Sequence, residues 1–171
     1  MSSGNKTKYE HLSSPKGSTL SGDWWTKNRL EVSKKSRSEY DDPEGVQEVC
    51  IDVAQILDEW IPDEECESQD DFVFDLAHYL DQNCNCDVEV QPDTPHGKPN
   101  ILLGDKLALV LRINPDKGER GRVVDQCVDY ASQWVTWIIF IGGRPNLVGQ
   151  VNNLMIDKGL DRILIWNFSY E

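Results

Sequence analysis

The chain has 171 residues and a formal net charge of −13, with 17 Lys and Arg against 30 Asp and Glu. This length predicts one domain with an appendage, and no apolar run approaches the about 20 residues that a membrane span needs. The segment from Met1 to Leu20 lacks the apolar run of a secretory signal, so we expect a cytoplasmic protein that is not attached to a membrane.

The N-terminal segment, residues 1–43, is rich in Ser, Gly, Lys and Asn and has no sustained apolar period. Residues 1–40 carry eight Lys and Arg and four Asp and Glu, a net charge of +4. This composition predicts a flexible, disordered basic arm. Trp24 and Trp25 are its exception, because two adjacent indoles are costly to leave in water. We expect them to dock on the parent domain, with a partner as the alternative.

The remainder, residues 44–171, is predicted to form one domain, and it is strongly acidic. Residues 41–171 have a net charge of −17, and residues 41–97 contain 18 Asp and Glu with no Lys or Arg. Such a surface repels phosphate backbones. Three interpretations remain open: adaptation to high intracellular salt, a docking face for a basic partner, or a mimic of nucleic-acid charge.

Two helices are predicted first. The first runs from Pro43 to Trp60, where apolar side chains recur on one face and Pro62 follows the end. The second begins after Ser68, an N-cap with Asp71 three residues further on, and ends near residue 83. Its apolar stripe includes Phe72, Leu76 and Leu80.

Three strands follow, at residues 87–91, 100–103 and 106–113, and Gly104-Asp105 is a hairpin-turn signal between the last two. The remaining elements are predicted as a helix, a strand, a helix and a strand, at residues 119–134, 135–141, 146–158 and 162–166. This order predicts an α/β fold in which a three-strand meander continues through two crossovers into parallel strands, with helices flanking a mixed sheet.

The five cysteines indicate reduced thiols. An odd number without a secretory signal argues against a disulfide framework. The sequence Cys84-Asn85-Cys86 has a spacing unusual for zinc, although a site that adds Cys66 and His78 is conceivable. We therefore expect buried or half-buried thiols and no metal site.

The segment around the meander carries a recognisable pattern. Pro99-Asn100 precedes the second strand, Val110 and Arg112 lie on the third, and Gln126-x-x-x-Tyr130 lies on the next helix. This arrangement resembles the PD-(D/E)XK superfamily of restriction-endonuclease-like and RecB-type nucleases, over residues 69–166. The resemblance implies a restriction-endonuclease-like core.

The same resemblance implies a nuclease site whose chemistry has been replaced. In active members an Asp opens the second strand and Glu-x-Lys lies on the third, and the carboxylates bind a divalent metal that activates water. Here Asn100, Val110 and Arg112 stand at the positions of Asp, Glu and Lys. The acidic residue of the first helix falls at Asp71 or Asp75. The expected vestigial site is Asp71, Asn100, Val110, Arg112, Gln126 and Tyr130.

These substitutions predict a pseudo-nuclease, a catalytically inactive module that serves as an interaction or regulatory subunit in nucleic-acid processing. It needs no cofactor, and its main partner is expected to be a protein. Nucleic acid is a further partner through the basic arm and the candidate residues Lys98, Arg112, Arg120 and Arg122. The alternatives are a divergent Mg²⁺-dependent nuclease with a rearranged carboxylate site, and an acidic inhibitor or nucleic-acid mimic that binds a basic protein.

Overall fold

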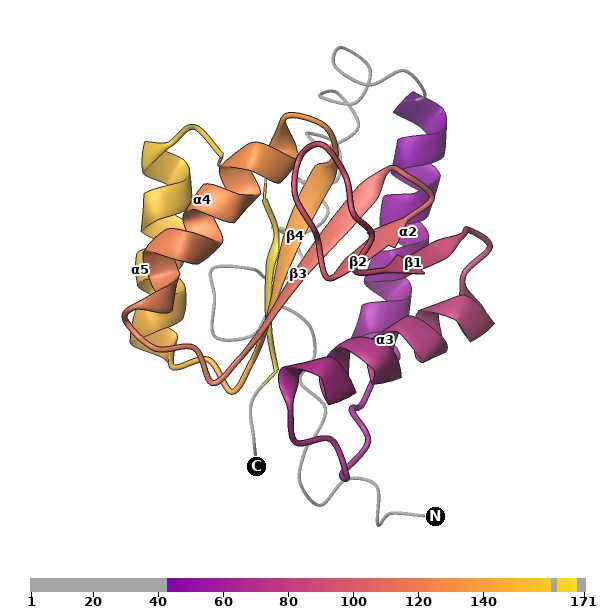
Figure 1. Cartoon of the computed structure of the whole chain (residues 1–171), viewed down its shortest axis with the longest axis horizontal. Helices are drawn as coiled ribbons and strands as arrows, with labels where there is room; N and C mark the ends of the chain where they lie inside the picture. The colour runs from indigo at the N-terminus through magenta and orange to yellow at the C-terminus, as the bar shows by residue number, and fades with distance from the viewer. Residues whose placement is uncertain (1–42, 161–162, 169–171) are drawn as a thin grey trace.

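The computed structural model describes residues 43–160 and 163–168. The predicted arm up to residue 42, with Trp24 and Trp25, lies outside the described residues. The described chain is an α/β fold in which one mixed five-stranded sheet lies between two pairs of helices (Figure 1). The α/β class and the mixed sheet flanked by helices are therefore confirmed.

The sheet has the order β1-β2-β3-β4-β5. Its strands are Val88–Val90 (β1), Ile101–Leu103 (β2), Leu107–Ile113 (β3), Val135–Ile141 (β4) and Ile165–Phe168 (β5). The first three strands form an antiparallel meander, whereas β3, β4 and β5 run parallel. The predicted meander and both crossovers are confirmed, and β3 lies at the centre of the sheet.

Each face of the sheet is covered by two helices. Helices α2 (Pro43–Glu59) and α3 (Gln69–Asn83) cover one face, and helices α4 (Glu119–Ala131) and α5 (Pro145–Asp157) cover the other (Figure 1). The predicted cap of α3 is confirmed. The Ser68 side chain accepts the Asp71 N–H at 3.2 Å, and the Asp71 carboxylate accepts the Ser68 N–H at 3.1 Å. Four otherwise unpaired N–H groups open every α-helix, and this box satisfies part of that need.

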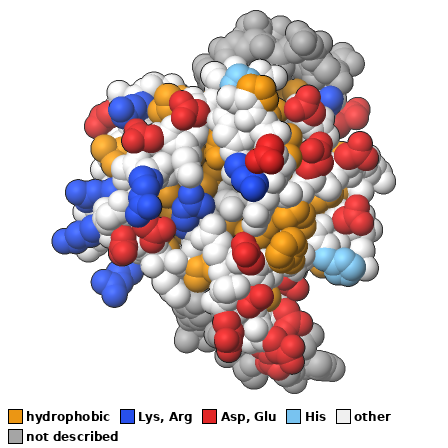
Figure 2. Space-filling view, viewed as in Figure 1, with side chains coloured by type: hydrophobic (Ala, Val, Ile, Leu, Met, Phe, Trp, Pro, Cys, Tyr) orange, Lys and Arg blue, Asp and Glu red, His pale blue; other side chains and the backbone are white. Residues whose placement is uncertain are grey.

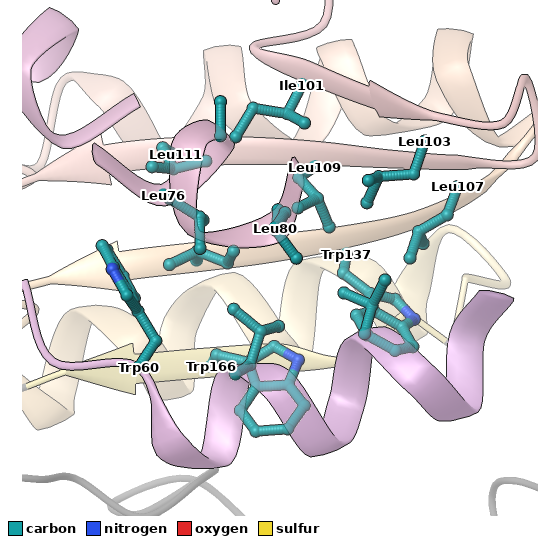
Figure 3. Packing of buried hydrophobic residues seen from close by; sticks show 14 of the residues in the cluster. Trp60, Leu76, Leu80, Ile101, Leu103, Leu107, Leu109, Leu111, Trp137 and Trp166 are labelled. Atoms are coloured by element: carbon teal, nitrogen blue, oxygen red, sulfur yellow. The ribbon is translucent and has the colours of Figure 1, made fainter. Parts of the chain in front are cut away.

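Alternation along β3 divides the core into two clusters. Leu107, Leu109 and Leu111 pack with α2 and α3, together with Trp137 and Trp166 of the neighbouring strands (Figure 3). The intervening residues of β3 face α4, because successive side chains of a strand point to opposite faces. The α4 face is where the polar residues of the predicted site lie.

Two elements have boundaries that differ from the prediction by two residues or more. The last strand is Ile165–Phe168 rather than 162–166. Asn167 interrupts the apolar run and so hid its continuation, but its buried side chain bonds the backbone of Gly143. Helix α4 ends at Ala131 rather than at residue 134, because Trp134 turns toward the β2–β3 hairpin and donates its indole N–H to Asp105 at 2.9 Å.

The cysteines correct another expectation. Cys84 and Cys86 are paired as a disulfide across the turn that ends α3, with their Cα atoms 5.6 Å apart, a separation that a disulfide spans. Two of the thiolates of the conceivable zinc site are therefore used in this bond. Cys50, Cys66 and Cys127 are free and buried, as expected. Burial raises the pKa of the Cys50 and Cys127 thiols to about 12.

Within residues 43–160 and 163–168, no helix combines the length and the apolar character needed to cross a membrane.

Candidate functional site

The structure brings Asn100 and Arg112 together on the α4 face of the sheet. Asn100 lies immediately before β2, and Arg112 is the next-to-last residue of the adjacent strand β3. The Asn100 Oδ1 atom accepts the N–H of Leu111 at 2.8 Å and an Nη1–H of Arg112 at 3.3 Å. The amide oxygen of Asn100 therefore joins the start of β2 to the end of β3.

Helix α4 completes the surroundings of the guanidinium. Arg112 Nη2 donates to Oε1 of Gln126, and Arg112 Nη1 donates to the carbonyl oxygen of Leu111 at 2.6 Å. The Glu119 carboxylate lies 4.0 Å from Arg112 Nε. Only 14% of the Arg112 side chain is exposed. We refer to Asn100, Arg112, Glu119 and Gln126 as the guanidinium cluster.

The electrostatics of this cluster are those of a cation held inside the chain. Desolvation lowers the pKa of the Arg112 guanidinium, and the nearby Glu119 carboxylate opposes that shift. Because an unperturbed guanidinium titrates above a pH of about 12, Arg112 stays charged near neutrality. The charge is balanced by one carboxylate and two neutral amide oxygens.

Tyr130, four residues after Gln126, lies in the adjoining core rather than against the guanidinium. Its side chain is buried, and its ring closes on Gly97, where a Cβ would lie 2.9 Å from Tyr130 Cε1. Burial raises the pKa of the Tyr130 hydroxyl, while a hydrogen bond with the Lys98 backbone and the charge of Arg112 lower it. The phenol therefore remains protonated near neutrality.

Val110 and Asp71 do not join the cluster. Val110 is 1% exposed and packs in the core beneath α4, which offers no polar atom at the position of the family's Glu. Asp71 opens α3, which packs on the opposite face of the sheet. Backbone hydrogen bonds from Ser68 and Glu67 lower the pKa of the Asp71 carboxyl, as expected of a helix cap.

Asp75, the other acidic candidate of α3, also has structural partners. Its carboxylate accepts the indole N–H of Trp60 at 3.0 Å and the backbone N–H of Asp63 at 3.3 Å. Asp75 thus ties the end of α2 and the following loop to α3.

The residues predicted to bind nucleic acid come from the loop before β2, from β3 and from α4. Lys98 is exposed and lies 3.7 Å from the carboxylate of Asp93. Arg120 bonds the Gln150 side chain of α5, and Arg122 is exposed on α4. Arg112 faces the interior of the cluster.

Glu119 was missed as a site residue by the sequence analysis. The sequence carried no separate signal for it, because a carboxylate in the first turn of a helix also stabilises the helix terminus. In the structure the Glu119 N–H donates to Asp116 Oδ1 at 3.1 Å, and the Asp116 N–H donates to Glu119 Oε1 at 3.2 Å, in the turn that leads into α4. These two bonds hold the second carboxylate oxygen of Glu119 near Arg112.

The described ranges, 43–160 and 163–168, contain no group of three or more His, Cys, Asp and Glu side chains arranged to hold a metal ion. Protein-family models, curated proteins and solved structures all fail to match the chain. The chemistry of the guanidinium cluster is therefore inferred from its own contacts.

Proposed function

We propose that the domain is a pseudo-nuclease: a nuclease-like module without hydrolytic activity that serves as an interaction or regulatory subunit in nucleic-acid processing. The element order from α3 through β4 and the convergence of Asn100, Arg112 and Gln126 support the resemblance to the PD-(D/E)XK superfamily. One observation is the main support for the absence of hydrolytic activity. A guanidinium of the chain itself is bonded to the side chains at two of the positions expected to form the site.

The electrostatic consequence is large. At an effective dielectric constant of about 20, a unit positive charge and a divalent cation about 4 Å apart repel each other by roughly 8 kcal/mol. Glu119 alone cannot offset this, because it already faces Arg112. Hard divalent cations prefer anionic oxygen ligands, and Asn100 and Gln126 supply only neutral ones. The cluster thus favours its internal cation over a metal ion.

The test is cleavage of single- and double-stranded DNA and RNA by the full chain in Mg²⁺ or Mn²⁺. We expect no cleavage by the wild type and none by Gln126→Ala. Metal-dependent cleavage that is lost in Gln126→Ala but retained in Val128→Ala, an exposed change two residues away, would overturn the proposal. That outcome would establish the divergent Mg²⁺ nuclease instead, with Glu119 as its nearest carboxylate.

The surface charge supports a protein as the main partner. Figure 2 shows acidic side chains gathered over α3 and the segment before it, while basic side chains lie mainly over α4 and α5. The acidic side chains between α2 and α3 and along α3 are exposed, except for half-buried Asp75. A partner with a basic surface complements this region, and charge complementarity of this kind increases the association rate.

The proposal that the partner has a basic surface is tested by replacing exposed acidic residues with Lys. Glu65, Glu67 and Asp81 are exposed acids on this side, so their joint change to Lys should weaken capture of a native partner and its salt dependence. The matched control reverses Asp125 and Asp129, which are exposed on α4. Equal partner capture by both variants would contradict a docking role for the acidic side.

A further inference from the structure

A cleft of about 1090 Å³ lies at the ends of β3 and β4, where the chain turns into α4 and α5. It is lined by the loop of residues 114–118, by Gly142 and Arg144 of the loop after β4, and by residues 145–147 and Gln150 of α5. In α/β sheets, ligands commonly bind outside the carboxyl ends of parallel strands. The volume lies slightly above the range of about 300–1,000 Å³ that is usual for small-molecule sites. None of the guanidinium-cluster residues lines this cleft.

The lining of the cleft carries more basic than acidic side chains. Lys117 comes from the first loop and Arg144 from the second. Arg120 adds a third cation, because it bonds the side chain of the lining residue Gln150. Asp116 is the only acid among the described lining residues, and its carboxylate already accepts the N–H of Glu119 at 3.1 Å. The lining therefore carries a net positive charge.

The loop that carries Arg144 is held in place by the buried side-chain amide of Asn167. Asn167 of β5, 4% exposed, accepts the Gly143 N–H at 3.1 Å and donates to the Gly143 carbonyl oxygen at 3.0 Å. The approach is so close that a Cβ on Gly143 would lie 2.7 Å from Asn167 Oδ1. Gly142 has φ +74°, which favours glycine. Binding to such a loop requires little further ordering, which reduces the entropic cost of association.

The first turn of α5 supplies main-chain donors beside these cations. Arg144 at its N-cap makes no side-chain capping bond, and Pro145 has no N–H. Asn146 and Leu147 occupy the next positions, where an α-helix offers no internal partner for the N–H. Both residues line the cleft. Cationic side chains and main-chain N–H donors are the groups that bind phosphate oxygens in proteins.

We propose that this cleft binds a phosphate-bearing ligand of nucleotide size. Lys117 and Arg144 contact the phosphate oxygens, the first turn of α5 adds N–H donors, and the space along Gln150 accommodates the remainder of the ligand. The site uses no residue of the guanidinium cluster. It therefore stands or fails independently of the pseudo-nuclease proposal.

The test is a titration of the ¹⁵N-labelled full chain with inorganic phosphate, AMP and a short single-stranded DNA, followed by NMR. We expect AMP to shift the amide signals of Gly142, Gly143 and Asn146, and to bind more tightly than inorganic phosphate. Joint change of Lys117 and Arg144 to Gln should weaken binding roughly tenfold or more, since each removes a charge-assisted hydrogen bond. Lys158→Gln, at the other end of α5, is the matched control and should bind as the wild type does.

Each outcome decides the matter. Shifts with the DNA alone that the double variant abolishes would place the phosphate in a polynucleotide and sustain the phosphate chemistry. The proposal is overturned if no probe shifts the cleft signals at up to about 10 mM, beyond the weak end of specific binding. It is also overturned if the double variant, with its other amide signals unchanged, binds as tightly as the wild type.

Discussion

Removal of the Arg112 guanidinium should destabilise the domain substantially. In Arg112→Ala, Asn100 Oδ1 keeps its bond from Leu111, but Gln126 Oε1 and the Leu111 carbonyl lose their donor. Hydrogen bonds to charged groups contribute roughly 1.5–3 kcal/mol each, and the relief of a desolvated charge offsets part of the loss. We therefore expect a net loss of about 2–4 kcal/mol in the free energy of unfolding.

Urea unfolding followed by far-UV circular dichroism measures this loss. With an m-value of about 1.5 kcal/mol/M, the midpoint should fall by roughly 1–3 M. Arg122→Ala is the matched control on exposed α4 surface, and its free energy of unfolding should stay within about 0.5 kcal/mol of the wild type. If Arg112→Ala unfolds at the same urea concentration as the wild type, the guanidinium does not hold this region together and the reasoning fails.

Three further predictions concern the helix cap, the cysteines and the glycines. The lowered pKa of Asp71 means that its stabilising effect is present above the unfolded-state pKa of about 3.9 and is lost as the pH falls through the folded-state value. Asp71→Asn should therefore lower the urea midpoint near neutral pH, and this decrease should shrink as the pH falls below about 3.9. A decrease that does not change with pH would contradict the cap. Thiol titration of the denatured, unreduced chain should give three reactive thiols, and titration after reduction should give five. In the folded state the buried thiols, including Cys127 with a pKa of about 12, should react slowly. Five reactive thiols before reduction would refute the disulfide. Gly143→Ala should destabilise the fold by at least about 2 kcal/mol in thermal unfolding, because its Cβ would clash with Asn167. Gly149→Ala has open space around its Cβ and should stabilise α5 by about 0.5–1 kcal/mol. If Gly143→Ala were the more stable of the two variants, the loop would not be held by Asn167 as described.

Periodicity in the sequence was sufficient for most of the fold. The apolar run of β3 and the apolar stripe of α2 indicate which segments are buried, and the structure confirms both elements. The end of α4 and the position of β5 depended on tertiary contacts. Trp134 leaves the helix for Asp105, and Asn167 enters a strand because its amide bonds Gly143. Neither partner is close in sequence, so no local pattern could show it.

The candidate site was predictable to a similar extent. The resemblance to the PD-(D/E)XK superfamily implied that Asn100, Arg112 and Gln126 belong to one site, and the structure places their side chains in contact. Asp71 could not be assigned by spacing, because a carboxylate in a first helical turn serves a cap as well as a site. Glu119 was hidden for the same reason. Its contacts with both Asp116 and Arg112 become visible only in the folded structure, because Arg112 lies on a different element.

The most direct test of the pseudo-nuclease proposal is a Mn²⁺ titration of the ¹⁵N-labelled full chain, observed through the side-chain signals of Asn100, Gln126 and Arg112. Paramagnetic broadening reports which groups lie near the metal. We predict that signals from the exposed acidic segment around Asp63 and Glu65 broaden first, while the guanidinium cluster remains sharp because its internal cation repels the metal ion. Selective early broadening of Asn100 and Gln126 would contradict the account and identify a metal site at the cluster.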